Sequence, residues 1–360
     1  AGANTTFITA GASFSDRLLH VLTTTVQIEG LALQGAPSNT GFAGAGLYNQ
    51  AGTVTVVRSA IQNNWTYNNG GGLSSSGTLT ITHSAVLSNT GSSGGGIFLS
   101  GGTVALINVT VSGNRANNYG GGIDSNGSTT LTLSNVTIVN NTADLDGDET
   151  GDGGGIRRSG GTTTLRNTLL ARNFDNSLGT KHPDCTGTLT SQGYNLLGDN
   201  TGCTMTAQTG DLIGTGASPI NPQLGFLAPN SNATLTHALA AGSPAIDAGN
   251  PATPGSGGSA CAIDDQRGLY RLLDGDGNGS ARCDIGAFEK DGEYPLGIVT
   301  VTVNTTADEL NTDGDCSLRE AIRATNLNTP VDACAAGGSL QTDTIQVPAG
   351  VYTLTVTGTD

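Results

Sequence analysis

Oxygen-bearing side chains recur at alternate positions in one short stretch of the sequence. Asp274, Asp276 and Asn278 precede a glycine, which is how an oxygen-rich Ca²⁺ loop begins. In the EF-hand pattern a bidentate glutamate follows at position 12, but here that position is Ile285 and the carboxylate of Asp284 comes one residue early. We therefore expect Ca²⁺ to bind through Asp274, Asp276, Asn278 and Asp284. The alternative is a solvated turn, since Asp, Asn and Gly favour turns for their own reasons.

A second acidic stretch, residues 144–152, interrupts a regular pattern. It carries enough carboxylates to bind a cation but has no regular ligand spacing. We expect a loop that projects from the surface, with Ca²⁺ binding as the alternative.

The residues that hydrolysis or elimination would need are scattered along the chain. Ser93 lies in a G-x-S-x-G stretch, but a glycine-rich turn lacks the strand-to-helix elbow that activates such a serine. The histidines have neither metal-ligand spacing nor an evident acidic partner, and we expect them at the surface: His20, His83, His182 and His237. No nucleophile, base and orienting group can be assembled from these positions, so we expect no catalytic activity.

The cysteines form an even set without a Cys-x-x-Cys pair, which argues against a zinc ribbon or a thioredoxin-type site. They fall into three local couples: Cys185 with Cys203, Cys261 with Cys283, and Cys316 with Cys334. Of the 15 possible connectivities this one avoids long crossings of the chain. We expect these three disulfides, and hence an oxidising, extracellular compartment.

Composition narrows the function further. The 360 residues include 29 Asp and Glu against 14 Lys and Arg, a net charge of −15 that would repel a phosphate backbone. We therefore expect no nucleic-acid partner. No apolar run approaches the roughly 20 residues of a membrane span, so we also expect no membrane span in this chain.

A repeat of 24 to 33 residues sets the expected fold. A glycine cluster followed by an aliphatic residue recurs, with glycines at Gly46, Gly72, Gly96, Gly122 and Gly155. Each repeat then carries an alternating strand and an asparagine in an equivalent place, at Asn64, Asn89, Asn114, Asn141 and Asn173. Such a unit is one turn of a parallel β-helix, with stacked aliphatic ladders and an internal asparagine ladder. The expected class is all-β: a right-handed parallel β-helix with a loop-rich terminal module and a short capping helix.

We expect five segments. Residues 1–173 form the coils, 174–215 a disulfide-closed elaborated coil, 216–290 a loop-rich module, 291–298 a linker, and 299–360 the opening strands and cap of a β-helix. Ser317 and Glu320 form a capping box, which predicts a short helix with Leu318 and Ile322 on one face as a lid over the open end.

Two groups of motifs resemble known families. Residues 316–322 read CSLREAI without a break, and this matches the motif of a domain found in large secreted bacterial β-helix proteins. Residues 221–225, 242–249, 265–268 and 283–289 look like the choice-of-anchor Q module that often ends such proteins. The coils are similar to those of polymorphic outer membrane proteins. The resemblance implies a bacterial, extracellular or cell-surface protein.

The order of these segments departs from the family, because the opening piece lies behind the closing module. The chain therefore looks circularly permuted, as if one unit were cut from a tandem array. We expect a non-catalytic structural or adhesive protein, the repeating unit of a fibre whose copies join head to tail through Phe7, Ile8, Val351, Leu354 and Val356. The alternative is a β-helix that binds or degrades polysaccharides, with surface glycans as partners; Trp65 is the sole tryptophan available as a sugar platform.

Overall fold

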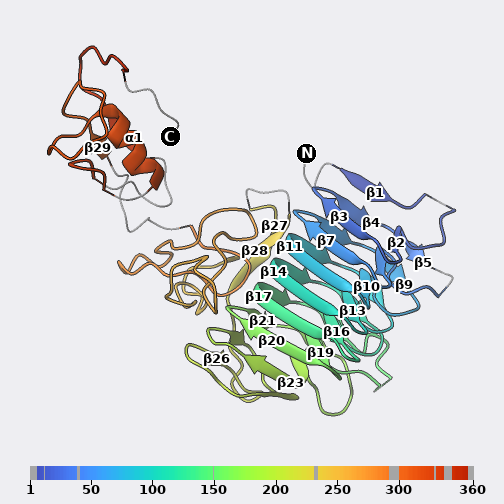
Figure 1. Ribbon diagram of the computed structural model, residues 1–360. Coiled ribbons are helices and arrows are strands. Elements are labelled where there is room, and N and C mark those ends of the chain that lie inside the picture. The colour runs from blue at the N-terminus through green and yellow to red at the C-terminus, as the bar shows by residue number, and fades with distance from the viewer. Residues whose placement is uncertain are drawn as a thin grey trace. The chain divides into compact units, whose positions relative to one another are not determined.

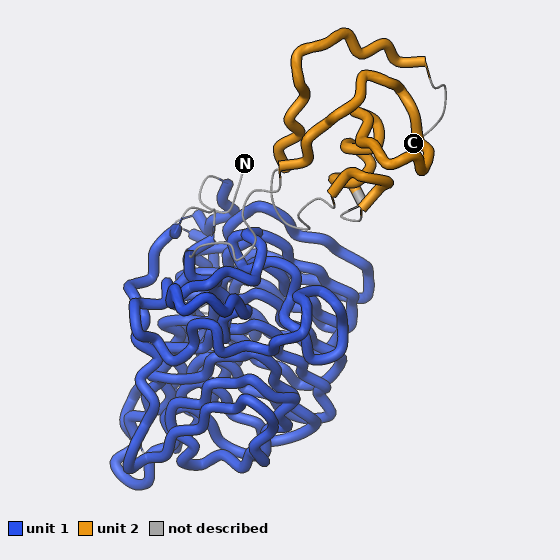
Figure 2. The backbone as a smooth tube through the Cα atoms, turned by 90° about the vertical axis from the view of Figure 1, so that its left-hand side faces the viewer, with its two compact units in different colours: residues 1–293 blue, residues 294–360 orange. Residues whose placement is uncertain are grey.

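The chain folds into two compact units, residues 1–293 and 294–360 (Figure 2). The computed structural model describes residues 6–11, 13–38, 41–148, 150–230, 234–291, 300–327, 330–335 and 343–355. The proposed linker thus lies outside the described residues except for Asp291.

Unit 1 is a parallel β-solenoid of about seven turns, which confirms the expected class (Figure 1). Its strands form three rows, each running from coil to coil. The short row consists of β2 (Leu19–Val21), β6 (Leu47–Asn49), β10 (Leu73–Ser75), β13 (Ile97–Leu99), β16 (Ile123–Ser125), β19 (Ile156–Arg158) and the start of β23 (Cys185–Ser191).

The long row follows it in each coil. It contains β1 (Phe7–Thr9), β3 (Thr25–Glu29), β4 (Ala32–Gln34), β7 (Thr53–Val57), β8 (Ala60–Gln62), β11 (Thr78–Leu87), β14 (Thr103–Ser112), β17 (Thr130–Val139), β20 (Thr162–Arg166), β21 (Leu169–Ala171), β24 (Leu196–Leu197) and β26 (Leu212–Ile213). The turn row then completes the coil with β5 (Pro37–Ser38), β9 (Trp65–Thr66), β12 (Thr90–Gly91), β15 (Arg115–Ala116), β18 (Thr142–Ala143) and β22 (Phe174–Asp175).

The core consists of aliphatic ladders, as the repeat predicts. Ile81 is opposite Val56 on one side and Leu106 on the other, and Leu106 is opposite Leu133. Leu106 and Leu133 are fully buried. Burial of one such side chain is worth about 1.5–3 kcal/mol, so each added coil extends the core by several such contributions.

The glycine clusters lie where the turn row leads into the short row. Gly94 adopts φ +60°, and a Cβ on Gly95 would lie 2.1 Å from the Arg115 carbonyl oxygen of the next coil. Because the two backbones approach so closely, no other residue fits at Gly95.

The asparagine ladder is confirmed inside the solenoid. Asn89 Nδ2 donates to Asn114 Oδ1 at 2.9 Å, and Asn114 Nδ2 donates to Asn141 Oδ1 at 2.9 Å. The chain of amides continues through Asn173 and ends on a carboxylate, where Asn173 Nδ2 donates to Asp184 Oδ1 at 2.9 Å. The sequence pattern did not predict this acidic end of the ladder.

The last coil is elaborated between residues 174 and 215. Strand β25 (Cys203–Met205) pairs with β23, and Cys185 is bonded to Cys203. The other two predicted disulfides, Cys261–Cys283 and Cys316–Cys334, also form. The module after this coil is built mainly of loops, with one antiparallel pair, β27 (Leu224–Ala228) and β28 (Thr236–Leu239).

Unit 2 has a core of its own around a parallel pair, β29 (Thr300–Thr302) and β30 (Thr344–Gln346). Helix α1 (Leu318–Leu327) begins at the predicted capping box: Ser317 N–H donates to Glu320 Oε2 at 3.0 Å, and Glu320 N–H donates to Ser317 Oγ at 3.2 Å.

The buried face of α1 differs from the expected one. Ala321 and Ala324 are fully buried, whereas Ile322 is 43% exposed. The small alanines allow the helix to approach β29 and the Cys316–Cys334 disulfide closely. No helix in the described ranges is long and apolar enough to cross a membrane.

Candidate functional site

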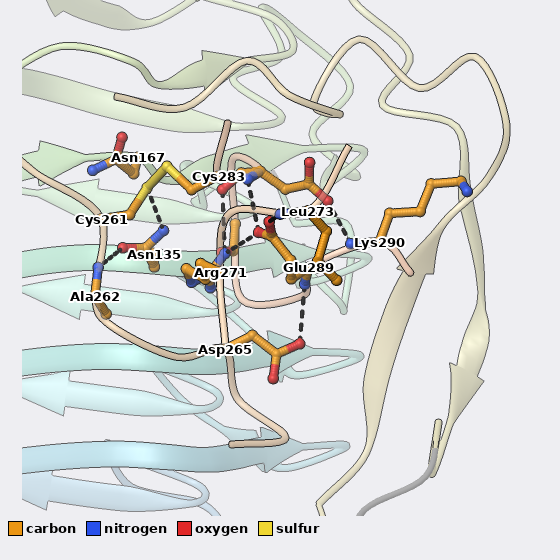
Figure 3. Close-up of polar contacts among 12 residues, drawn as sticks. Asn135, Asn167, Cys261, Ala262, Asp265, Arg271, Leu273, Cys283, Glu289 and Lys290 are labelled. Atoms are coloured by element: carbon orange, nitrogen blue, oxygen red, sulfur yellow. Dashed lines mark hydrogen bonds and ion pairs between the residues drawn. A yellow bond between two sulfur atoms is a disulfide. The ribbon is translucent and has the colours of Figure 1, made fainter. Parts of the chain in front are cut away.

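The loop-rich module packs along the flank of the coils through a second, outward-facing row of residues. Asn108, Asn135 and Asn167 occupy equivalent bends of the long row, with φ of 54°, 52° and 47°. Asn135 Oδ1 accepts a hydrogen bond from Ala262 N–H at 2.9 Å (Figure 3). Asn167 Nδ2 donates to the Ser259 carbonyl at 2.9 Å. Sequence analysis missed this row, although the recurrence of asparagine at these bends is a readable signal, because asparagine tolerates the left-handed conformation.

A buried ion pair contacts the same row of asparagines at Asn108. Arg271 and Glu289 are both fully buried, and Arg271 Nη1 lies 3.2 Å from Glu289 Oε2 (Figure 3). Arg271 Nη2 also donates to Asn108 Oδ1 at 3.0 Å, so the pair links the module to the coils. Burial raises the pKa of Glu289, while the Arg271 charge acts in the opposite direction. Such a charged group is stable in the interior only when every partner is present.

Asp284 belongs to this interior network and not to a group with the Asp274 loop. Its Oδ1 accepts a hydrogen bond from Asp247 N–H at 2.7 Å, and the residue is 1% exposed. Burial and then the neighbouring Glu289 raise the pKa of Asp284. The group of carboxylates that converges with Asp274 and Asp276 does not include Asp284.

The carboxylates that do converge near the Asp274 loop are those of Asp247, Asp274 and Asp276, which each offer an oxygen within 4.8 Å of the others. Asp274 accepts three backbone N–H groups from its own loop, at 2.7, 2.8 and 3.0 Å. Asn278 donates its side-chain amide to Asp276 Oδ2 at 2.8 Å. These contacts are those of a hydrogen-bonded turn. Binding of Ca²⁺ at this loop stays a prediction.

Two histidines are not the free surface residues that the sequence suggested. His237 is 5% exposed, with Nε2 2.9 Å from Ser112 Oγ and Nδ1 2.9 Å from the Gly225 carbonyl oxygen. Burial lowers the pKa of His237. His83 Nε2 lies 2.9 Å from Asp264 Oδ1. Both side chains connect the module to the coils. The sequence could not show this because the partners across the contact, Ser112 and Asp264, lie more than a hundred residues away from the histidines that they meet.

An acidic cluster with one arginine at its centre lies on the outer side of the short row. Asp124 and Arg157 are opposite each other in β16 and β19, with Arg157 Nη1 3.3 Å from Asp124 Oδ1. Arg157 Nε lies 3.3 Å from Asp152 Oδ1, and its guanidinium carbon lies 3.9 Å from the centre of the Tyr119 ring. The sequence analysis did not predict that these residues lie close together.

Burial raises the pKa of Asp124 to about 6, against the lowering effect of Arg157. A carboxyl group that titrates there suits acid–base chemistry. However, Asp124 is only 1% exposed, so little of its side chain could contact a substrate. Arg157 contacts the carboxylates of Asp124 and Asp152 and the Tyr119 ring, and these contacts hold the cluster together.

Aromatic side chains gather on the first coils. His20 and Tyr48 are opposite each other in β2 and β6 with ring centres 4.9 Å apart, and the Arg17 guanidinium lies 4.8 Å from the Tyr48 ring. On the turn row, the rings of Trp65 and Tyr67 lie 4.3 Å apart, and Tyr67 is 66% exposed. Ring faces of this kind are the usual platforms for sugars.

The expected inter-unit residues are exposed where the structure describes them. Phe7 and Ile8 in β1 are 48% and 37% exposed, and Val351 and Leu354 are 84% and 67% exposed. Val356 lies outside the described residues. Within the described part of the chain, β1 pairs with β4 and with no other strand, so its second edge is open.

Comparisons with protein-family models, with curated proteins and with solved structures give no match to this chain. The resemblance to CSLREAI and choice-of-anchor Q proteins therefore depends on the motifs alone.

Proposed function

We propose that this chain is a non-catalytic extracellular protein of a bacterial surface, with a structural or adhesive role, and that it is the repeating unit of a head-to-tail fibre. The observation that carries the proposal is the edge of β1 that no strand of the described residues covers, which presents Phe7 and Ile8 at the end of a continuous parallel ladder. An exposed strand edge with apolar side chains is a template for another strand.

The construction of unit 1 supports a structural role. The internal asparagine ladder, the Cys185–Cys203 disulfide and the module fixed along the flank all act against local opening. Unit 2 supplies a second parallel pair and exposed apolar residues, Val351 and Leu354. Copies could join covalently, as tandem repeats in one chain, or by strand addition between separate chains.

Electron microscopy and light scattering of the purified chain over a range of concentrations test this proposal. We expect rods that lengthen end to end, and we expect Phe7→Lys with Ile8→Lys to abolish them, since charges on a strand edge oppose pairing. Leu178→Lys, at a 76% exposed site in a loop, is the matched control and should still assemble. Particles that stay monomeric at high concentration, or rods insensitive to the edge substitutions, would exclude a fibre built by strand addition between separate chains.

A second function, polysaccharide binding, is favoured by the adjacent rings of Trp65 and Tyr67. A glycan array tests it, with Tyr67→Ala as the variant, because removal of an exposed ring deletes a stacking surface without opening the core. Retention of a captured glycan by Tyr67→Ala would remove this candidate platform.

A further inference from the structure

The described residues of the acidic stretch, 144–148 and 150–152, lie in a loop that is held at both ends. Asp144 N–H donates to the Asn118 carbonyl and Leu145 N–H donates to the Ala116 carbonyl, each at 3.0 Å. At the other end, Ser177 Oγ donates to the Gly151 carbonyl at 3.0 Å. The described residues of this loop thus lie between the coils before and after it.

Three of these carboxylates converge. Asp144, Asp146 and Asp148 each offer an oxygen, and the three oxygens lie within 4.8 Å of one another. Asp146 and Asp148 lie nearer the solvent, whereas Asp144 is fully buried. Gly147, with φ +69°, provides the turn between them.

One oxygen of the buried carboxylate has no partner. Asp144 Oδ1 accepts the Asp148 N–H at 3.2 Å, but Asp144 Oδ2 is shielded from solvent and has no hydrogen-bond partner among the described residues. An unsatisfied buried polar atom is rare in folded proteins, and for an ionised oxygen the cost is larger still.

Basic side chains do not neutralise the negative charge of the three carboxylates either. In the described part of the chain, none of the three carboxylates forms an ion pair with a basic side chain, and Arg157 is engaged by Asp124 and Asp152. Three negative charges at this separation repel one another unless a cation lies among them.

We propose that the carboxylates of Asp144, Asp146 and Asp148 bind a divalent cation, and that this cation is Ca²⁺. All the donors are oxygens, which excludes the soft ligand sets of zinc and copper. The alternation of aspartates around a glycine in a loop gives the irregular, adaptable geometry that Ca²⁺ accepts and that Mg²⁺ does not. This site is distinct from the Asp274 loop and does not depend on the proposed fibre.

Calorimetric titration of the metal-free full chain with CaCl₂ tests the site, using Asp144→Asn and Asp146→Asn as variants. We expect each variant to lose one equivalent of binding, or to bind it at least tenfold more weakly. Asp146→Asn matters most, because this side chain is exposed and its change should not disturb folding. Asp276→Asn is the matched control: it removes a carboxylate from the group of Asp247, Asp274 and Asp276 and should leave this equivalent intact.

A second readout locates the bound ion. Limited proteolysis followed by mass spectrometry should show that Ca²⁺ protects the bonds between residues 145 and 151 in the wild type but not in Asp146→Asn. Unchanged stoichiometry and affinity in both variants, or a wild type that binds no Ca²⁺ at millimolar concentration, would overturn the proposal.

Discussion

At the scale of single residues, the solenoid depends on polar side chains that its own interior satisfies. Asn114 is fully buried; its Nδ2 donates to the Val86 carbonyl and to Asn141 Oδ1, both at 2.9 Å, while its Oδ1 accepts from Asn89. An amide at this position therefore connects three coils. If this amide is removed, each buried polar group that loses its partner carries the full cost of its desolvation.

We predict that Asn114→Ala lowers the free energy of unfolding by about 3–5 kcal/mol, because several buried polar groups lose their partner at once. Chemical denaturation monitored by circular dichroism measures it. Asn126→Ala is the control: Asn126 Oδ1 accepts a local bond from Gly127 N–H, so we expect a change below about 1 kcal/mol. Equal effects of the two substitutions would contradict the role of the ladder.

Asp184, at the end of the asparagine ladder, makes the folding stability of the chain depend on pH. Burial raises its pKa from 3.8 to about 6 in the folded chain, so between about pH 4 and 6 the folded state binds more protons than the unfolded state. Stability contributed by this group is therefore greatest below pH 4 and falls as the pH rises to 6, by on the order of 3 kcal/mol.

We predict that Asp184→Asn removes this decline. The variant should lose a constant amount of stability, because its amide replaces the oxygen that accepts Asp199 N–H at 2.7 Å, but wild type and variant should converge as the pH rises from 4 to 6.5. Melting temperatures across this range measure the difference. A curve for Asp184→Asn that runs parallel to that of the wild type would refute the assignment.

At the scale of elements, the module is fixed to the coils by the buried Arg271–Glu289 pair. We predict that Arg271→Met destabilises unit 1 by about 3–5 kcal/mol, because it leaves Glu289 buried without its counter-charge. It should also loosen the module, which hydrogen exchange at residues 262–273 would detect. Arg58→Met, which removes an exposed pair with Glu29, should cost less than about 1 kcal/mol. Unchanged exchange in Arg271→Met would show that the remaining contacts suffice.

At the scale of the whole molecule, the disulfides are divided between two compact units. Cys185–Cys203 and Cys261–Cys283 lie in unit 1, and Cys316–Cys334 lies in unit 2. Because each unit has its own core, each disulfide should stabilise the unit that contains it.

We predict that replacing Cys316 and Cys334 by serine lowers the stability of unit 2 by about 2–4 kcal/mol and leaves that of unit 1 unchanged. Hydrogen exchange resolved by peptide distinguishes the units. The reciprocal variant, Cys185→Ser with Cys203→Ser, should affect unit 1 alone. Loss of protection in both units from either variant would contradict their independence.

The sequence by itself determined the features that repeat. The coil length, the aliphatic ladders through Ile81 and Leu106, and the internal asparagines follow from one local pattern, since each residue packs against its own equivalent in the next coil. The three disulfides and the start of α1 were also predicted correctly, because local loops and a capping box are encoded by neighbouring residues.

The tertiary structure alone decided the features that join distant segments. Asn108 meets Arg271, and Ser112 meets His237, across more than a hundred residues, so no spacing rule relates them. The same holds for Asp284, which the sequence assigned to a calcium loop but which hydrogen-bonds to Asp247 in the buried network. The burial that raises the pKa of Asp124 exists only after the coils have stacked. The contacts of Asn108 and Ser112 exist only after the module has packed on the coils.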